Sequence, residues 1–225
     1  MDSANLFASF FERNLQKDQI IISPAIEIKF FSRPKILKKT TNLIFTSSNG
    51  VKAAGQAVND NIRAICVGDR TTSLASSLGY SAEKYGDNVE QLIKKLCLSK
   101  KIGGDILHIR GKYTKVDLMN RLREAGFLCH EWEGYDQIAK NLSFQALNAF
   151  KNGEKIILPI FSERSGRLLK DQIPNFDKSH IIAISSAVAN VFLDVSPASI
   201  SEAQTPDLVG MRSSTKTVLE NAHLE

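Results

Sequence analysis

One short pattern occurs twice in this chain: an apolar run, then a hydroxyl-bearing residue, then residues typical of a helix. Ile44–Ser47 shows the pattern first, and Pro159–Ser162 repeats it near the other end. A second strand-like run follows each copy, at Ala64–Val67 and at Ile181–Ile184. Strands that are apolar on both faces are typical of a parallel sheet covered by helices. The repeat therefore predicts an α/β protein with two similar lobes, each a parallel sheet flanked by helices.

Composition and cysteine usage narrow the class of protein. Hydrophobic residues make up 43% and charged residues 24% of the 225 residues, which is typical of a globular protein. No apolar run approaches the roughly 20 residues that span a bilayer, and the N-terminus has no signal-peptide pattern, so we expect no membrane association. Cys66, Cys97 and Cys129 stand in apolar contexts, where a free thiol behaves as a small hydrophobe. We therefore expect a cytoplasmic protein without disulfides.

The formal net charge of +5 leaves more than one type of partner open. The basic clusters are not interleaved with aromatic residues and match no nucleic-acid-binding motif, so we expect no nucleic-acid partner. Solvated helix faces explain such clusters most simply. An anionic small molecule that needs nearby positive charge is the other interpretation.

The order of the expected elements predicts a discontinuous arrangement of the two lobes. Residues 32–133 form the continuous lobe, and residues 1–28 and 139–225 together form the other. Two linkers, at about residues 25–31 and 134–138, are expected to join the lobes as a pair of strands with a cleft between the lobes. Short apolar runs also predict strands at Gln19–Ser23 and Asp194–Val195.

Hydroxyl and basic residues follow the expected strands, at the edge where α/β sheets bind ligands. Each hydroxyl alone is explained by helix capping. Together with helix N-termini they would offer many hydrogen-bond donors to carboxylates. The candidates are Ser47, Ser48, Thr71, Ser162, Ser165, Ser185 and Ser186, with Arg110, Gly111 and Lys112 at another strand end.

Other catalytic motifs are absent from the sequence, and one tyrosine stands out. The four histidines show no metal-ligand spacing, so we expect no metal site, and no dinucleotide fingerprint or serine-nucleophile motif is present. Tyr135 follows Gly134 at the expected hinge. It is either a packed aromatic between the lobes or a catalytic phenol.

The chain resembles the uroporphyrinogen-III synthase family over nearly its whole length. Each similar segment is short, and their order and spacing carry the resemblance. The segments are Pro24–Ile28, Leu43–Val51, Val67–Thr72, Asp105–Gly111, Gly126–Tyr135 and Ala203–Leu208.

The resemblance implies a fold, a reaction and a set of site residues. It implies two α/β domains joined by a two-stranded linker, and a cytosolic enzyme of haem (tetrapyrrole) synthesis without metal or organic cofactor. Such an enzyme, a lyase, closes hydroxymethylbilane into uroporphyrinogen III, inverts the last pyrrole ring and releases water. It adds Asn49 and Gly68 to the expected substrate-binding residues, and Tyr135 becomes the expected proton donor for the departing water. We expect a monomer.

Two departures from the family pattern support an alternative. Met1 stands where the family's first helix begins, so we expect the family's first strand to be missing. Val188 stands where the family has a hydroxyl residue, in the turn that starts at Ser185. The alternative is a non-catalytic or degenerate two-lobed module that binds an anionic ligand.

Overall fold

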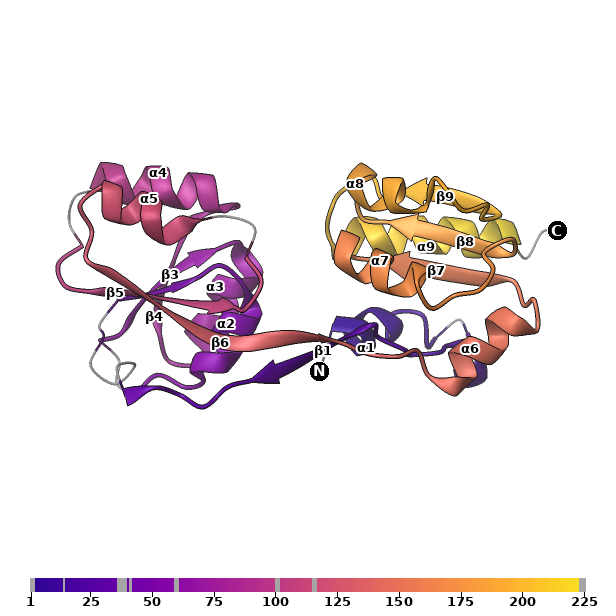
Figure 1. Cartoon of the computed structure of the whole chain (residues 1–225), viewed down its shortest axis with the longest axis horizontal. Coiled ribbons are helices and arrows are strands. Elements are labelled where there is room, and N and C mark those ends of the chain that lie inside the picture. Colours follow the sequence, from indigo (N-terminus) through magenta and orange to yellow (C-terminus); the bar gives the residue numbers. More distant parts are fainter. Residues whose placement is uncertain are drawn as a thin grey trace. The chain divides into compact units, whose positions relative to one another are not determined.

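The computed structural model divides the chain into two compact units, which are described separately. Unit 1 comprises Met1–Glu27 and Ala139–Glu225, and unit 2 comprises Ile28–Ile138. The α/β class is confirmed, with helices flanking the sheet of each unit (Figure 1). The structure describes residues 3–13, 15–35, 40, 42–58, 61–99, 102–114 and 117–222.

Unit 2 contains a sheet with the strand order β1-β6-β5-β2-β3-β4. Neighbouring strands from β6 to β4 are parallel, and β1 at the edge makes the sheet mixed. The strands are β1 (Ile26–Phe30), β2 (Asn42–Phe45), β3 (Arg63–Val67), β4 (Ser81–Gly86), β5 (Ile106–Gly111) and β6 (Cys129–Ala139). The helices are α2 (Ser48–Ala54), α3 (Asp69–Ser77), α4 (Val89–Ser99) and α5 (Leu118–Glu124).

Both faces of this sheet are covered, because its central strands are apolar on both sides. On β2, Leu43 and Phe45 pack with residues of α2 and α3, whereas Ile44 packs with residues of α4 and α5. These three side chains are fully buried. Figure 1 shows the two helix pairs on opposite sides of the sheet. Because helices cover both faces of the sheet, the strand ends are where a ligand-binding site can lie.

Unit 1 contains a smaller parallel sheet with the order β7-β8-β9. On β8, Ile181 packs with Phe192 on one face, and Ile182 packs with Phe7 and Met211 on the other. The strands are β7 (Ile156–Ile160), β8 (Ser179–Ala183) and β9 (Ser199–Glu202). The helices are α1 (Ser3–Ala8), α6 (Phe144–Lys151), α7 (Glu163–Lys170), α8 (Ser186–Ala189) and α9 (Leu208–Ala222), with short 3-10 turns at Lys17–Gln19 and Asn190–Phe192.

Two strands expected from the sequence are wrong, and one observed strand was not expected. Asp194 and Val195 lie in a turn and bend instead of a strand, the exposed Asp194 carboxylate pairs with Lys170, and the third strand is β9. Gln19–Ser23 is not a strand, since it has no strand partner among the described residues. The edge strand β4 was not expected at all.

The chain passes between the units twice, in β1 and in β6, which are neighbours in the sheet order. The Phe31 N–H donates to the Gly134 carbonyl at 2.9 Å, and the Lys140 N–H donates to the Ala25 carbonyl at 2.8 Å. β6 continues without interruption from Cys129 to Ala139, so the second passage is regular strand rather than loop.

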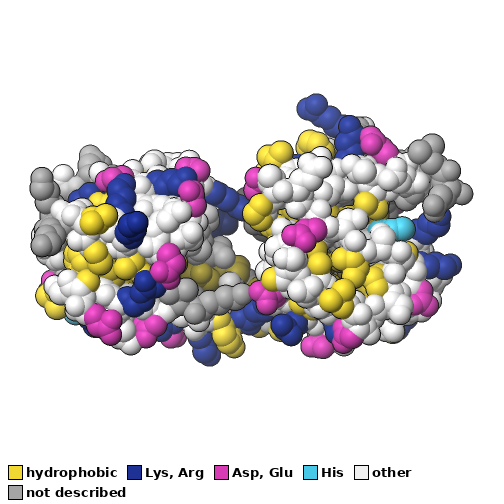
Figure 2. Space-filling model, turned by 90° about the horizontal axis from the view of Figure 1, so that it is seen from above, with side chains coloured by type: hydrophobic (Ala, Val, Ile, Leu, Met, Phe, Trp, Pro, Cys, Tyr) yellow, Lys and Arg dark blue, Asp and Glu magenta, His cyan; other side chains and the backbone are white. Residues whose placement is uncertain are grey.

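The surface is mixed in charge. Figure 2 shows basic and acidic side chains interspersed over both units, and in this view the described residues form no continuous basic stripe. Among the helices that the structure describes, none is long and apolar enough to cross a membrane.

Candidate active site

The carboxyl ends of the parallel strands in unit 2 meet at one edge of the sheet. Ser47 follows β2, Gly68 follows β3, Gly111 ends β5, and Tyr135 lies on β6 in register with Gly111. Parallel α/β sheets bind their ligands at this edge. Four of the residues predicted from the sequence thus come from neighbouring strands.

Ser47 is placed by its role as the N-cap of α2. Its backbone is extended, with φ −156°, and its Oγ accepts a hydrogen bond from the Gly50 N–H at 3.3 Å. Serine is a favoured N-cap for this reason. Ser48 and Asn49 form the first turn of α2 and are half-buried. The local sequence therefore fixes the Ser47 hydroxyl at the sheet edge.

The hydroxyl groups of Tyr135 and Ser47 are hydrogen-bonded to each other, with Oη and Oγ 3.0 Å apart. Tyr135 is only 6% exposed. Its ring lies against Gly111, where an added Cβ would stand 2.7 Å from the ring. The Lys112 N–H donates to the Tyr135 carbonyl at 2.9 Å. Gly111 thus provides the space that holds the phenol beside Ser47.

Gly68 and Thr71 lie at the start of α3. Gly68 has φ +75°, a conformation that glycine adopts without strain, and no atom lies within 4 Å of an added Cβ. The Thr71 side chain is buried, at 6% exposure. The backbone at Gly68 is therefore more open to a ligand than the Thr71 hydroxyl is.

Arg110 is already paired within the protein. Its guanidinium donates to both carboxylate oxygens of Glu131, at 3.0 and 2.9 Å, and lies 3.0 Å from Glu133. The hydrogen bonds raise the pKa of Arg110 and lower the pKa of Glu131. These two carboxylates were not predicted from the sequence, although their spacing on β6 puts them on one face.

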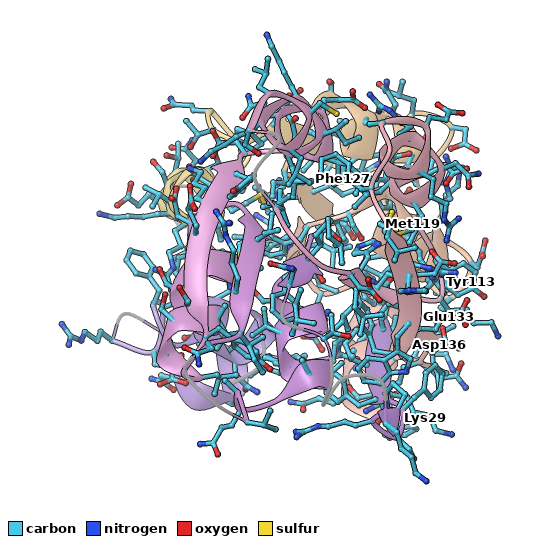
Figure 3. The ribbon with its side chains drawn as sticks, turned by 90° about the vertical axis from the view of Figure 1, so that its left-hand side faces the viewer. Lys29, Tyr113, Met119, Phe127, Glu133 and Asp136 are labelled. Atoms are coloured by element: carbon cyan, nitrogen blue, oxygen red, sulfur yellow. The ribbon has the colours of Figure 1, made fainter. Side chains whose placement is uncertain are left out.

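Lys112 differs from Arg110 in its exposure. Its Nζ lies 3.9 Å from an Asp136 carboxylate oxygen, and its side chain is 55% exposed. Figure 3 shows Glu133 and Asp136 following one another along the same side of unit 2. Lys112 therefore keeps its charge accessible to solvent, whereas Arg110 is neutralised by its neighbours.

The corresponding edge of unit 1 carries the other predicted serines. Ser162 caps α7: its Oγ accepts from the Ser165 N–H at 3.1 Å and donates to Ser165 Oγ at 2.9 Å. Ser185 is the N-cap residue of α8, without a side-chain cap bond, and Ser186 is exposed. Val188 is 2% exposed and belongs to the core, which accounts for an apolar residue at this position.

Comparison with known proteins identifies the family. Residues 17–211 match the profile described as uroporphyrinogen-III synthase HemD. A sequence search of curated proteins finds no match.

The fold resembles solved structures whose titles name the same family. The structure titled uroporphyrinogen-III synthetase from Helicobacter pylori has a TM-score of 0.67 and 18% identity, over 86% of this chain and 91% of that chain. A mutant uroporphyrinogen III synthase from Thermus thermophilus has a TM-score of 0.55 and 12% identity, over 97% and 95%. The structural likeness supports the fold, and the profile match covers most of the sequence. The chain belongs to the uroporphyrinogen-III synthase family.

Proposed function

We propose that this chain closes hydroxymethylbilane into uroporphyrinogen III, with Tyr135 as the proton donor. The family is one of cyclising lyases whose substrate is a tetrapyrrole. The profile match over residues 17–211 supports this activity over a non-catalytic binding module. The observation that carries the role of Tyr135 is its hydrogen bond to Ser47 beside Gly111, at the carboxyl edge of the sheet.

The hydroxyl pair explains how a phenol could assist the loss of water. In the proposed arrangement, the Ser47 hydroxyl donates to Tyr135 Oη, which leaves the phenol proton for the substrate. The carbon–oxygen bond of the terminal hydroxymethyl group breaks, and the departing oxygen takes this proton and leaves as water. The carbon then bonds to the last pyrrole ring at the position that already carries the methylene bridge. The bond from that position to the bridge breaks, and the bridge carbon bonds to the free position of the same ring, which inverts the ring. The proton released from the free position restores the phenol. A positioned acid of this kind typically contributes about 100- to 10,000-fold.

The substrate carboxylates are proposed to bind at helix starts more than at any single basic side chain. The N-termini of α2 and α7 carry partial positive charge and N–H donors. Gly68 gives a ligand close access to backbone, and Lys112 supplies an exposed charge. The proposed substrate-binding set is completed by six further residues: Ser48, Asn49, Thr71, Ser165, Ser185 and Ser186. Arg110 contributes to it through its backbone and through the residues next to it. This distribution suits a ligand that carries many carboxylates.

The first test replaces the phenol. Tyr135→Phe is expected to lower turnover by about 100-fold, the lower end of the range for a positioned acid, while the fold stays intact. Hydroxymethylbilane is supplied, and the rate and the isomer of the product are measured. Tyr80→Phe is the control, because it removes a phenol of the same unit that donates to the Gly55 carbonyl instead.

The outcomes separate the alternatives. Wild-type turnover in Tyr135→Phe would show that Tyr135 is only a packed aromatic residue. Other groups would then hold the two ends of the substrate in the geometry that ring closure requires. A wild-type protein that gives no excess of isomer III would identify a non-catalytic binding module.

We also propose a cytoplasmic monomer that acts without a cofactor and without nucleic acid. The cysteines Cys66, Cys97 and Cys129 are free thiols, which supports a reducing compartment. Light scattering during gel filtration should give the mass of one 24.9 kDa chain.

A further inference from the structure

Phe30 is an exposed aromatic residue beside the hydroxyl pair of the candidate active site. It ends β1, and its ring centroid lies 6.4 Å from that of Tyr135. Phe30 is 45% exposed, whereas Tyr135 is almost fully buried. A single exposed apolar side chain needs no explanation by itself. This ring, however, extends the candidate active site by an aromatic surface that a ligand can reach.

Strand pairing fixes the position of the Phe30 ring. β1 and β6 are neighbours in the sheet order, and the Phe31 N–H donates to the Gly134 carbonyl at 2.9 Å. Side chains alternate along a strand, so Phe30 shares a face with Ile28, which packs against the same core cluster as Tyr135. By the same alternation, Phe31 lies on the opposite face. Regular strand, rather than a loop, therefore holds Phe30 beside the phenol.

Within the described residues, the face of the Phe30 ring is not taken up by a stacked ring or by a basic side chain. The rings of Phe30 and Tyr135 are tilted by 60° to each other, so they do not stack. Lys and Arg side chains of the described segments lie over the rings of Tyr85 and Phe10, and not over that of Phe30. The face of an aromatic ring carries partial negative charge and attracts cations. Phe30 therefore offers this attraction to a ligand.

The proposed loss of water leaves a positive charge on the substrate. The carbon–oxygen bond breaks with both electrons going to the oxygen, which takes the phenol proton of Tyr135 and leaves as water. The remaining carbon is electron-deficient, and it shares its positive charge with the pyrrole ring that carries it. The phenolate of Tyr135 balances this charge. The charge leaves the first pyrrole ring when the carbon bonds to the last one.

We propose that Phe30 stabilises this cation through a cation–π contact and is thus a second catalytic residue beside Tyr135. The pyrrole ring that loses water lies against the face of Phe30, while its hydroxyl group meets Tyr135 Oη. The contact strengthens only as the charge forms, and such an interaction raises the rate of the step rather than the affinity for the substrate. The inference rests on the proposed cyclisation, to which it adds a group that recognises the cation.

The first test changes the electron density of the ring and keeps its shape. Phe30 is replaced in the full-length protein by mono-, di- and trifluorinated phenylalanine, which weaken the attraction of the face for a cation in steps. Hydroxymethylbilane is supplied, and kcat and KM for the formation of uroporphyrinogen III are measured. We expect kcat to fall with each fluorine, by about 5- to 30-fold in total, while KM stays nearly constant. Uroporphyrinogen III lacks the cation, so its affinity should be unchanged across the series.

Conventional variants complete the test. Phe30→Leu keeps an apolar side chain without an aromatic face and should lower kcat to a similar extent. Phe30→Tyr keeps the aromatic face and should retain a kcat close to that of the wild type. Phe31→Leu is the matched control, because Phe31 is the next residue, is 36% exposed and lies on the opposite face of the strand. It should leave kcat and KM unchanged.

Three results would overturn the proposal. Equal kcat across the fluorinated series in an active protein would show that Phe30 meets no cation, and it would leave the role of Tyr135 intact. A loss of product affinity that matches the loss of kcat would show that Phe30 binds the tetrapyrrole in every state. A wild-type protein that forms no excess of isomer III would remove this proposal together with the proposed function. If Phe30→Leu does not fold, the fluorinated series still decides, because fluorine changes the size of the ring very little.

Discussion

At the scale of single residues, Gly111 is as important to the candidate active site as the two hydroxyl groups are. An added Cβ would stand 2.7 Å from the Tyr135 ring, so Gly111→Ala must displace the phenol from Ser47. We expect turnover to fall by about 100-fold, as in Tyr135→Phe, and stability to fall by about 1–3 kcal/mol through overpacking. Steady-state kinetics and urea unfolding measure the two effects. Gly103→Ala is the control, because no atom lies within 4 Å of its added Cβ, and wild-type turnover in Gly111→Ala would contradict the model of the site.

The buried side chain of His108 leads to a second prediction, which concerns the pH dependence of stability. Burial holds its folded-state pKa near 4, below its ordinary value of 6.5, so on acidification the unfolded chain binds a proton first. The contribution of this residue to stability is complete above pH 6.5, and it is lost as the pH falls from about 6.5 to 4. The loss amounts to about 3 kcal/mol.

Urea unfolding of the wild type and of His108→Leu over this pH range checks the prediction. The variant should lack this part of the pH dependence, since leucine does not titrate. Parallel curves for the two proteins would mean that other groups cause the acid sensitivity.

The residues of the site were predictable one by one from the sequence, but their interactions were not. Ser47 and Tyr135 are 88 positions apart, and only the parallel pairing of the strands brings their hydroxyls together. Arg110 looked like a free cation, because nothing local to it signals the register that places it opposite Glu133. Strand order and register, which are long-range properties, decide which candidates meet.

At the scale of elements, the strands that the sequence reveals most directly are the apolar runs covered by helices on both sides. β2, β3, β5, β7 and β8 are apolar runs that their sequences reveal directly. β4 was missed because it is an edge strand that carries Glu83 and Lys84 and alternates only weakly. β9, with the sequence Ser-Ile-Ser-Glu, has a single apolar residue. β4 and β9 are edge strands with too few apolar residues for composition to identify them, whereas the edge strand β7 is apolar enough to be predicted.

The helix caps of unit 1 allow a matched prediction. Ser162 accepts the Ser165 N–H, whereas Ser185 makes no side-chain cap bond. Ser162→Ala should therefore lower the free energy of unfolding by about 1 kcal/mol, and Ser185→Ala should change it by less than about 0.5 kcal/mol. Urea denaturation measures both, and equal losses in the two variants would show that the Ser162 bond does not stabilise α7.

At the scale of the whole molecule, the two units have separate hydrophobic cores. Leu43 belongs to a core cluster of unit 2 and Ile181 to one of unit 1, and both are fully buried. Leu43→Ala and Ile181→Ala should each cost about 2–5 kcal/mol. Hydrogen exchange should show the loss of protection mainly in the unit that carries the change. Equal loss in both units after either change would mean that the units unfold as one cooperative body.

The discontinuity of unit 1 has a consequence for biosynthesis. A ribosome delivers the whole of unit 2 before it begins the second segment of unit 1, which starts at Ala139. Phe7 and Phe11 pack with Ile182 and Met211 in the finished protein, so these two aromatic rings leave the exit tunnel long before their partners exist. Domains generally complete their folding as units during synthesis. Unit 2 can therefore fold while Phe7 and Phe11 are still without their packing partners, and unit 1 can complete its core only after Ile182 and Met211 have been synthesised.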